Sequence, residues 1–233
     1  MQHDRRHSAR LGSHGQAMGT SGDRASRAAP RLTLVTPPLG RADATADALA
    51  AALNAADIAA VLLRPGEGDE GALVARIEAL RILIQSNGAA LLLDGHPDLV
   101  ARTQADGAHL TGIEAFKAAA PSLKPKYIAG CGALTTRHDA MLAGESGADY
   151  VMFGEPDRAG RRPGFEAVLE RCSWWAETLT IPCVGYAASL DEAAALANAG
   201  ADFVALDETL WRDARTLAAA LEALTQRVAE PAR

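Results

Sequence analysis

The sequence contains few aromatic residues, few lysines and few cysteines, and it has no long apolar run. Aromatic residues make up 4% of its 233 residues, whereas roughly a fifth of the chain is alanine. Alanine has the highest intrinsic helix propensity, so this composition argues against an all-β sandwich. The chain is long enough to bury one large core. Its length fits a single α/β barrel as naturally as two small domains.

Three further absences set expectations about partners and location. No stretch approaches the ~18–20 apolar residues of a membrane-spanning helix, so no membrane partner is expected. Cys131, Cys172 and Cys183 are odd in number and form no C-x-x-C pair, which predicts reduced thiols and a cytoplasmic protein. A formal net charge of -6 repels nucleic acid, so no nucleic-acid partner is expected either.

Residues 1–30 differ in composition from the rest of the chain. They carry five arginines against two aspartates, a charge of +3, and they are rich in Gly, Ser and His without a periodic apolar pattern. A signal peptide would need a core of ~7–15 apolar residues, which this stretch lacks. The sequence therefore predicts a disordered tail over residues 1–30, followed by one domain over residues 31–233.

From residue 30 onward, short apolar runs alternate with alanine-rich helical stretches. The runs are near-continuous, as in strands that are buried on both faces of a parallel sheet. Eight runs are found, at residues 32–35, 58–63, 89–93, 107–110, 127–129, 150–153, 181–184 and 203–206. Helices are predicted among others at residues 42–56, 69–86, 135–146, 165–178, 190–199 and 213–228, with a capping box at Ser189–Glu192.

Eight strand-helix units in this domain average about 25 residues each, which is close to the smallest size of a (β/α)8 barrel. A doubly wound sheet is the competing fold. Its dinucleotide fingerprint G-x-G-x-x-G is absent after the first strand, where Thr36-Pro37-Pro38-Leu39-Gly40 stands instead. The predicted fold class is therefore α/β, a single (β/α)8 TIM barrel with a disordered N-terminal tail.

Four phrases stand near the ends of predicted strands: Leu34-Val35-Thr36, Val61-Leu62-Leu63-Arg64, Ala105-Asp106-Gly107-Ala108-His109-Leu110 and Gly147-Ala148-Asp149-Tyr150-Val151-Met152-Phe153-Gly154. Taken in this order along the chain, they resemble the thiamine phosphate synthase and TenI family of (β/α)8 proteins. The resemblance implies a transferase of thiamine biosynthesis that joins a hydroxymethylpyrimidine diphosphate to a thiazole phosphate with Mg²⁺ and releases diphosphate. A diphosphate leaving group needs cations, and helix N-termini can hold a further phosphate.

Matching the family's pattern residue by residue gives a set of candidate site residues. Arg64 matches the family's arginine after the second strand, and Asp94 lies one position from its metal-binding aspartate. Glu114 stands near the acidic residue that follows the fourth strand. We expect Arg64 and Asp94 to be catalytic and Asp94 and Glu114 to bind Mg²⁺, solvated or helix-capping carboxylates being the alternative. Substrate contacts are expected at Arg64, His109, Gly132, Gly154, Arg161 and Gly185.

Other positions depart from the family's pattern. The chain has three lysines, at positions 117, 124 and 126, and none stands where the family uses one. Arg158, Arg161 and Arg162 in the sixth loop are the candidate replacements, because a guanidinium binds phosphate in a bidentate manner. Asp207 and Glu208 end the eighth strand, where they compete with a phosphate for backbone amides.

Three functions remain open at this level. The first is a divergent synthase that retains the transferase reaction. The second, which the replaced residues favour, is a non-catalytic paralogue that binds a thiamine-pathway or other small heterocycle. The third is a TenI-like tautomerase, whose histidine after the fifth strand is Leu134 here. For the first two functions, the expected ligand is a small phosphorylated heterocycle.

Trp174-Trp175 on a predicted helix suggests a homo-oligomer interface, because adjacent helical residues point in different directions and both are not expected in the core.

Overall fold

The structure is a computed structural model that describes residues 29–40, 43–157, 159–213 and 215–219. The N-terminal 28 residues of the predicted tail lie outside the described residues, as do residues 220–228 of the last predicted helix and Arg158 of the sixth loop. No helix among the described residues is long and apolar enough to cross a membrane.

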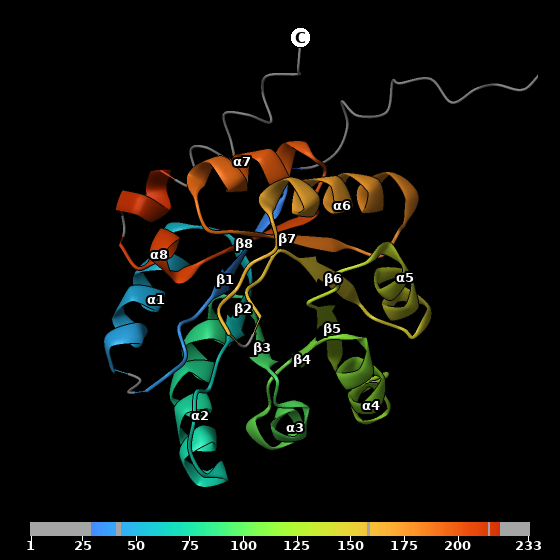
Figure 1. Cartoon of the computed structure of the whole chain (residues 1–233). Coiled ribbons are helices and arrows are strands. Elements are labelled where there is room, and N and C mark those ends of the chain that lie inside the picture. The colour runs from blue at the N-terminus through green and yellow to red at the C-terminus, as the bar shows by residue number, and fades with distance from the viewer. Residues whose placement is uncertain (1–28, 41–42, 158, 214, 220–233) are drawn as a thin grey trace, which may run out of the picture.

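Eight parallel strands close into a barrel in the order of the sequence, with helices packed around it, so the predicted (β/α)8 fold is confirmed (Figure 1). The strands are β1 (Arg31–Val35), β2 (Ile58–Leu63), β3 (Ala90–Asp94), β4 (Gly107–Thr111), β5 (Ile128–Gly132), β6 (Tyr150–Phe153), β7 (Cys183–Ala187) and β8 (Phe203–Leu206). The helices are α1 (Asp43–Ala55), α2 (Glu70–Ser86), η2 (Pro97–Leu99), α3 (Val100–Thr103), α4 (Ile113–Leu123), α5 (Arg137–Glu145), α6 (Phe165–Thr178), α7 (Leu190–Asn198) and α8 (Glu208–Trp211).

Side-chain caps start several helices where the sequence has a short polar residue. Asp69 caps α2 by accepting a hydrogen bond from Ala72 N at 2.8 Å, and Ser189 caps α7 by accepting one from Glu192 N at 3.1 Å. These bonds satisfy backbone donors that the first turn of a helix leaves unpaired. The helix start that the capping box predicts at Ser189 is therefore confirmed.

Two apolar cores follow from the alternation of side chains along each strand. The larger core lies between the strands and the helices and contains most of the buried Leu, Ile, Val and Ala residues. The smaller core fills the barrel interior and consists of Val35, Leu62, Leu92, Tyr150, Met152, Val184, Tyr186 and Ala205. Both faces of the strands are thus buried, which explains why the strands are near-continuous apolar runs in the sequence.

A repeated aspartate joins neighbouring strands at the amino-terminal end of the barrel. Asp106 accepts a hydrogen bond from Leu91 N at 2.7 Å, Asp149 from Ala129 N at 2.8 Å and Asp202 from Cys183 N at 2.9 Å. Each aspartate directly precedes a strand and accepts a hydrogen bond from the strand before it in the chain. The Ala-Asp phrases that carry much of the family resemblance therefore have a structural role, at the end of the barrel opposite the mouth.

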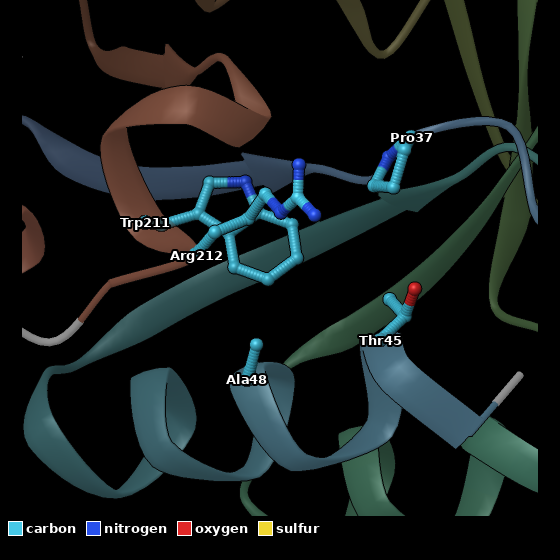
Figure 2. A pocket seen from close by; sticks show the side chains of 5 residues that line it. All are labelled: Pro37, Thr45, Ala48, Trp211 and Arg212. Atoms are coloured by element: carbon cyan, nitrogen blue, oxygen red, sulfur yellow. The ribbon is translucent and has the colours of Figure 1, made fainter.

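The barrel closes where its first and last strands pair. β1 pairs with β8 in parallel, and the buried indole of Trp211 donates a hydrogen bond to Val35 O at 3.0 Å. Trp211 and Arg212 line a small pocket with Pro37 and with Thr45 and Ala48 of α1 (Figure 2). This pocket lies between α8 and α1.

Candidate functional site at the mouth of the barrel

Charged residues gather at the carboxyl ends of the strands because of the alternation inside the barrel. Leu62, Leu92 and Ala205 belong to the interior core of β2, β3 and β8. Since side chains alternate along a strand, the residues two positions further on also face inward. These residues are Arg64, Asp94 and Asp207, and the strands end at this level. The carboxyl ends of the strands are where (β/α)8 barrels bind their small molecules.

Arg64 and Asp94 form an ion pair, so two predicted site residues are brought together. Arg64 Nε lies 3.4 Å from Asp94 Oδ2, and the two side chains are 23% and 27% exposed. The backbone N–H of Arg64 donates to Thr36 Oγ1 at 3.0 Å, which fixes the start of the loop after β2. The guanidinium is therefore anchored at the mouth and accessible to an anionic ligand.

Asp207, which follows β8, is held from two sides at the mouth. The Tyr186 hydroxyl donates to Asp207 Oδ2, and Thr209 donates to Oδ1 through its N–H at 3.0 Å and its hydroxyl at 2.8 Å. Burial alone would raise the pKa of Asp207, but these hydrogen bonds and the charge of Arg64 bring it below its ordinary value of 3.8. Asp207 is thus a carboxylate at neutral pH.

A buried chain of polar side chains runs below the mouth between β4 and β6. His109 Nδ1 lies 2.9 Å from the Tyr150 hydroxyl, and its Nε2 lies 3.8 Å from Glu155 Oε1. His109 is 2% exposed and Glu155 is 9% exposed. Within the part of the chain that the structure describes, His109 Nε2 and Glu155 Oε2 have no hydrogen-bond partner.

Gly132 and Ala133 at the end of β5 create the space for Glu155. A Cβ built on Gly132 would overlap Glu155 Oε1 and would lie 2.5 Å from His109 Nε2. Ala133 has a φ of 51°, a left-handed conformation that is uncommon for a non-glycine residue. This conformation accompanies a hydrogen bond from the Ala133 N–H to Glu155 Oε1. The glycine is therefore required by the carboxylate beside it.

The Glu155 charge also affects neighbouring groups. Burial, and to a lesser extent the charges of Glu155 and Asp139, raises the pKa of the Cys131 thiol to about 12. Burial together with nearby carboxylates also raises the pKa of Tyr150 well above its usual range. Cys131 is therefore a buried thiol that stays protonated at neutral pH.

The remaining predicted substrate contacts lie in different surroundings. Arg161 is exposed and pairs with Asp157 at 2.9 Å within the sixth loop. Gly154 accepts a hydrogen bond from Arg162 Nε through its carbonyl at 3.1 Å. Gly185 allows close packing, because a Cβ there would lie 2.7 Å from Leu196 of α7. The structure thus gives Gly185 a role in packing a helix on a strand.

The predicted Mg²⁺ ligands can be tested against the geometry. Glu114 lies exposed in the first turn of α4. The described residues contain no group of three or more His, Cys, Asp or Glu side chains that could hold a metal ion. Asp94, however, has an oxygen beyond its contact with Arg64, and Mg²⁺ is commonly held by one or two carboxylates together with substrate phosphates. Asp94 fits that donor set.

Glu155 and Glu192 are the residues that sequence reasoning missed. Glu155 directly follows the phrase that ends at Gly154, and the sequence signal for it is Gly132 on the neighbouring strand, which leaves room for its carboxylate. Glu192 stands at the acidic position of the predicted capping box, but its carboxylate accepts the N–H of Ala188 rather than that of Ser189, and it pairs with Arg162 across 30 residues of chain. No local sequence pattern predicts the pairing of Arg162 with Glu192.

The fold and site together define a (β/α)8 barrel whose charged groups face one another where such barrels bind small molecules. Comparison with known proteins agrees with this class. Residues 32–210 match the family described as thiamine monophosphate synthase. The chain belongs to this family.

Individual relatives support the assignment. The thiamine-phosphate synthase of Rhodospirillum centenum is 38% identical over 194 residues, covering 82% of this chain and 94% of that protein. The thiamine-phosphate synthase of Hyphomonas neptunium is 35% identical over 202 residues, covering 83% and 91%. Among solved structures, a thiamine phosphate pyrophosphorylase from Pyrococcus furiosus aligns with a TM-score of 0.66 at 20% identity, covering 86% and 96%. This last likeness concerns the fold.

Proposed function

We propose that the protein joins a hydroxymethylpyrimidine diphosphate to a thiazole phosphate and releases diphosphate, as a thiamine phosphate synthase. The observation that carries the proposal is the Arg64–Asp94 pair at the mouth of a barrel that belongs to this family. The non-catalytic reading is less favoured, because the curated relatives cover nearly the whole barrel and are thiamine-phosphate synthases.

Arg64 is the residue that binds the diphosphate in this proposal. Its guanidinium contacts Asp94 through Nε at 3.4 Å, whereas that of Arg162 is held more closely, in a bidentate pair with Glu192. A guanidinium stabilises charge that develops on a phosphate oxygen as the leaving group departs. Arg64 therefore both orients the pyrimidine diphosphate and stabilises the diphosphate as it forms.

Asp94 would hold Mg²⁺ against the substrate's phosphates, and the metal would supply further neutralisation of the leaving group. The net charge of the side chains at the mouth supports the need for a further cation beside the diphosphate. Arg64 and Arg162 carry two positive charges, and Asp94, Glu155, Glu192 and Asp207 carry up to four negative ones. A diphosphate would enter an acidic site that requires an additional cation. We propose Asp94 as its protein ligand, without Glu114.

The other sequence predictions belong to the same proposal. The ligand is a small phosphorylated heterocycle bound at the mouth, with Gly154 as a predicted contact, and His109 and Gly132 lie in the buried layer below it. Trp175 is buried, whereas Trp174 is partly buried under the guanidinium of Arg137 at 4.8 Å. A homo-oligomer that uses this helix face stays a prediction, which sedimentation at micromolar concentration tests.

Diphosphate release is the direct test. Purified protein is mixed with the pyrimidine diphosphate, the thiazole phosphate and Mg²⁺, and released diphosphate is measured. We expect Mg²⁺-dependent release, and a fall in kcat/KM of about 100- to 1000-fold in Arg64→Ala, because a lost contact to developing charge costs ~2.7–4 kcal/mol.

Arg31→Ala is the matched control, because Arg31 begins β1 at the other end of the barrel and pairs with exposed Asp57 at 3.2 Å. This variant should retain kcat/KM within about twofold. Absence of release above background at high protein concentration would refute the synthase function. If the pyrimidine diphosphate then still raised the melting temperature, the non-catalytic reading would replace it.

A further inference from the structure

A carboxylate of the chain itself lies at the end of β7, where a phosphate is often bound in this fold. In many (β/α)8 barrels the loops after the seventh and eighth strands hold a phosphate through backbone N–H groups. Here the backbone N–H of Ala188, the first residue after β7, donates to Glu192 Oε2 at 2.8 Å. Glu192 reaches back to this N–H from the first turn of α7.

Arg162 holds the same carboxylate in a bidentate pair. Its Nη2 lies 2.8 Å from Glu192 Oε2, and its Nη1 lies 3.2 Å from Oε1. The two side chains are 25% and 19% exposed, so the pair is partly shielded from solvent. A guanidinium fork and a backbone N–H around two oxygens are the donors that a phosphate would require.

The other donors of Arg162 are committed as well. Its Nε donates to Gly154 O at 3.1 Å and its Nη2 to Tyr186 O at 3.4 Å. The guanidinium also lies over the Tyr186 ring, 5.3 Å from the centroid. Arg162 therefore joins the ends of β6 and β7 to α7, and four of its five N–H donors are engaged in these bonds.

The end of β8 is filled in the same manner. Asp207 accepts the backbone N–H of Thr209, and its other oxygen accepts the Tyr186 hydroxyl. The donors at the ends of β7 and β8 are already bound to the carboxylates of Glu192 and Asp207, so a phosphate there could not use them. The negative charges of the two carboxylates would also repel it. Like charges in a poorly solvated site repel strongly.

We propose that Glu192, held by Arg162, occupies the phosphate position of the acceptor subsite, so that the barrel accepts a thiazole alcohol at least as well as its phosphate ester. The proposal rests on the proposed function and refines its acceptor. In the reaction the bond between the pyrimidine methylene carbon and the diphosphate oxygen breaks, and diphosphate leaves with the electron pair. The lone pair of the thiazole ring nitrogen forms the new carbon–nitrogen bond. No proton or electron is exchanged with a further reactant.

The test compares the two acceptors in the diphosphate-release assay. For the wild-type protein we expect a KM for the thiazole phosphate that is equal to or higher than that for the thiazole alcohol. A lower KM for the phosphate overturns the proposal. Glu192→Gln retains the shape but removes the charge that neutralises Arg162. This variant should lower the KM for the phosphate by about tenfold and change the KM for the alcohol by less than about twofold.

Glu170→Gln is the matched control, because Glu170 is an exposed carboxylate of α6 that pairs with Arg137 at 2.6 Å. It changes the net charge equally and should leave the ratio of the two KM values unchanged. An unaltered ratio in a folded Glu192→Gln protein, judged by its melting temperature, also overturns the proposal. If that variant does not fold, the wild-type comparison decides.

Binding of inorganic phosphate separates this proposal from the proposed function. In calorimetric titrations without substrates, Glu192→Gln should bind phosphate more tightly than the wild-type protein by about tenfold. If neither acceptor supports diphosphate release, the synthase function fails, and the titration alone tests whether Glu192 fills an anion site. Equal phosphate affinity of the two proteins then refutes that role.

Discussion

Replacing Gly132 by alanine should destabilise the protein through a carboxylate that is distant in sequence. The added Cβ would overlap Glu155 Oε1 and would lie 2.5 Å from His109 Nε2, and both side chains are buried. Two costs are expected. Overpacking of a filled interior costs about 1–3 kcal/mol. Displacing Glu155 from the Ala133 N–H leaves a buried polar group unpaired, which costs about 1–3 kcal/mol more.

The free energy of unfolding should therefore fall by about 2–6 kcal/mol in Gly132→Ala. For a chain of this size, 1 kcal/mol corresponds to a shift in Tm of roughly 2–4 °C, so a decrease on the order of 5–20 °C is expected. Calorimetry and urea unfolding followed by circular dichroism measure the two quantities.

A double-mutant cycle with Glu155→Ala identifies the cause. If the alanine methyl group acts through the carboxylate, removing Glu155 relieves the overlap. The double variant should then be more stable than the sum of the two single effects predicts, by about 0.5–3 kcal/mol. A change of less than about 0.5 kcal/mol in Gly132→Ala, or additive effects in the cycle, would refute the reasoning.

Two further predictions concern protonation. Hydrogen bonds hold the pKa of Asp207 below 3.8 despite its burial, so its contribution to stability is present above the unfolded pKa and is lost as the pH falls through the folded one. Acid unfolding should show a shallower loss of stability below about pH 4 in Asp207→Asn than in wild type; parallel curves would contradict this. Because the pKa of Cys131 is raised to about 12 by burial, the native thiol should not react with iodoacetamide at pH 8, and mass spectrometry should find label only after unfolding. Rapid labelling of native Cys131 would contradict its burial.

Much of the fold follows from the sequence because both faces of each strand are buried. The predicted runs at residues 58–63, 150–153 and 203–206 coincide with β2, β6 and β8. The run at residues 127–129 underestimates β5, which continues to Gly132, because the glycines and Cys131 carry little apolar signal. β7 begins two residues later than predicted, at Cys183.

The candidate site was predictable only in part. Arg64 and Asp94 follow apolar runs at strand ends, and alternation along the strands brings them together. The Arg162–Glu192 pair depends on how a loop crosses to the next helix, which no local pattern encodes. Glu155 likewise depends on the absent side chain of Gly132 on another strand.

The pairing of β1 with β8, which closes the barrel, has a consequence for folding during synthesis. Trp211 bonds Val35 across 176 residues, and β1 has its second neighbour only in β8. During synthesis, β1 therefore presents an unpaired edge until nearly the whole barrel has left the ribosome, and such edges invite aggregation. A chain that stops before β8 is therefore expected to leave β1 and β7 with open edges that can associate with other chains.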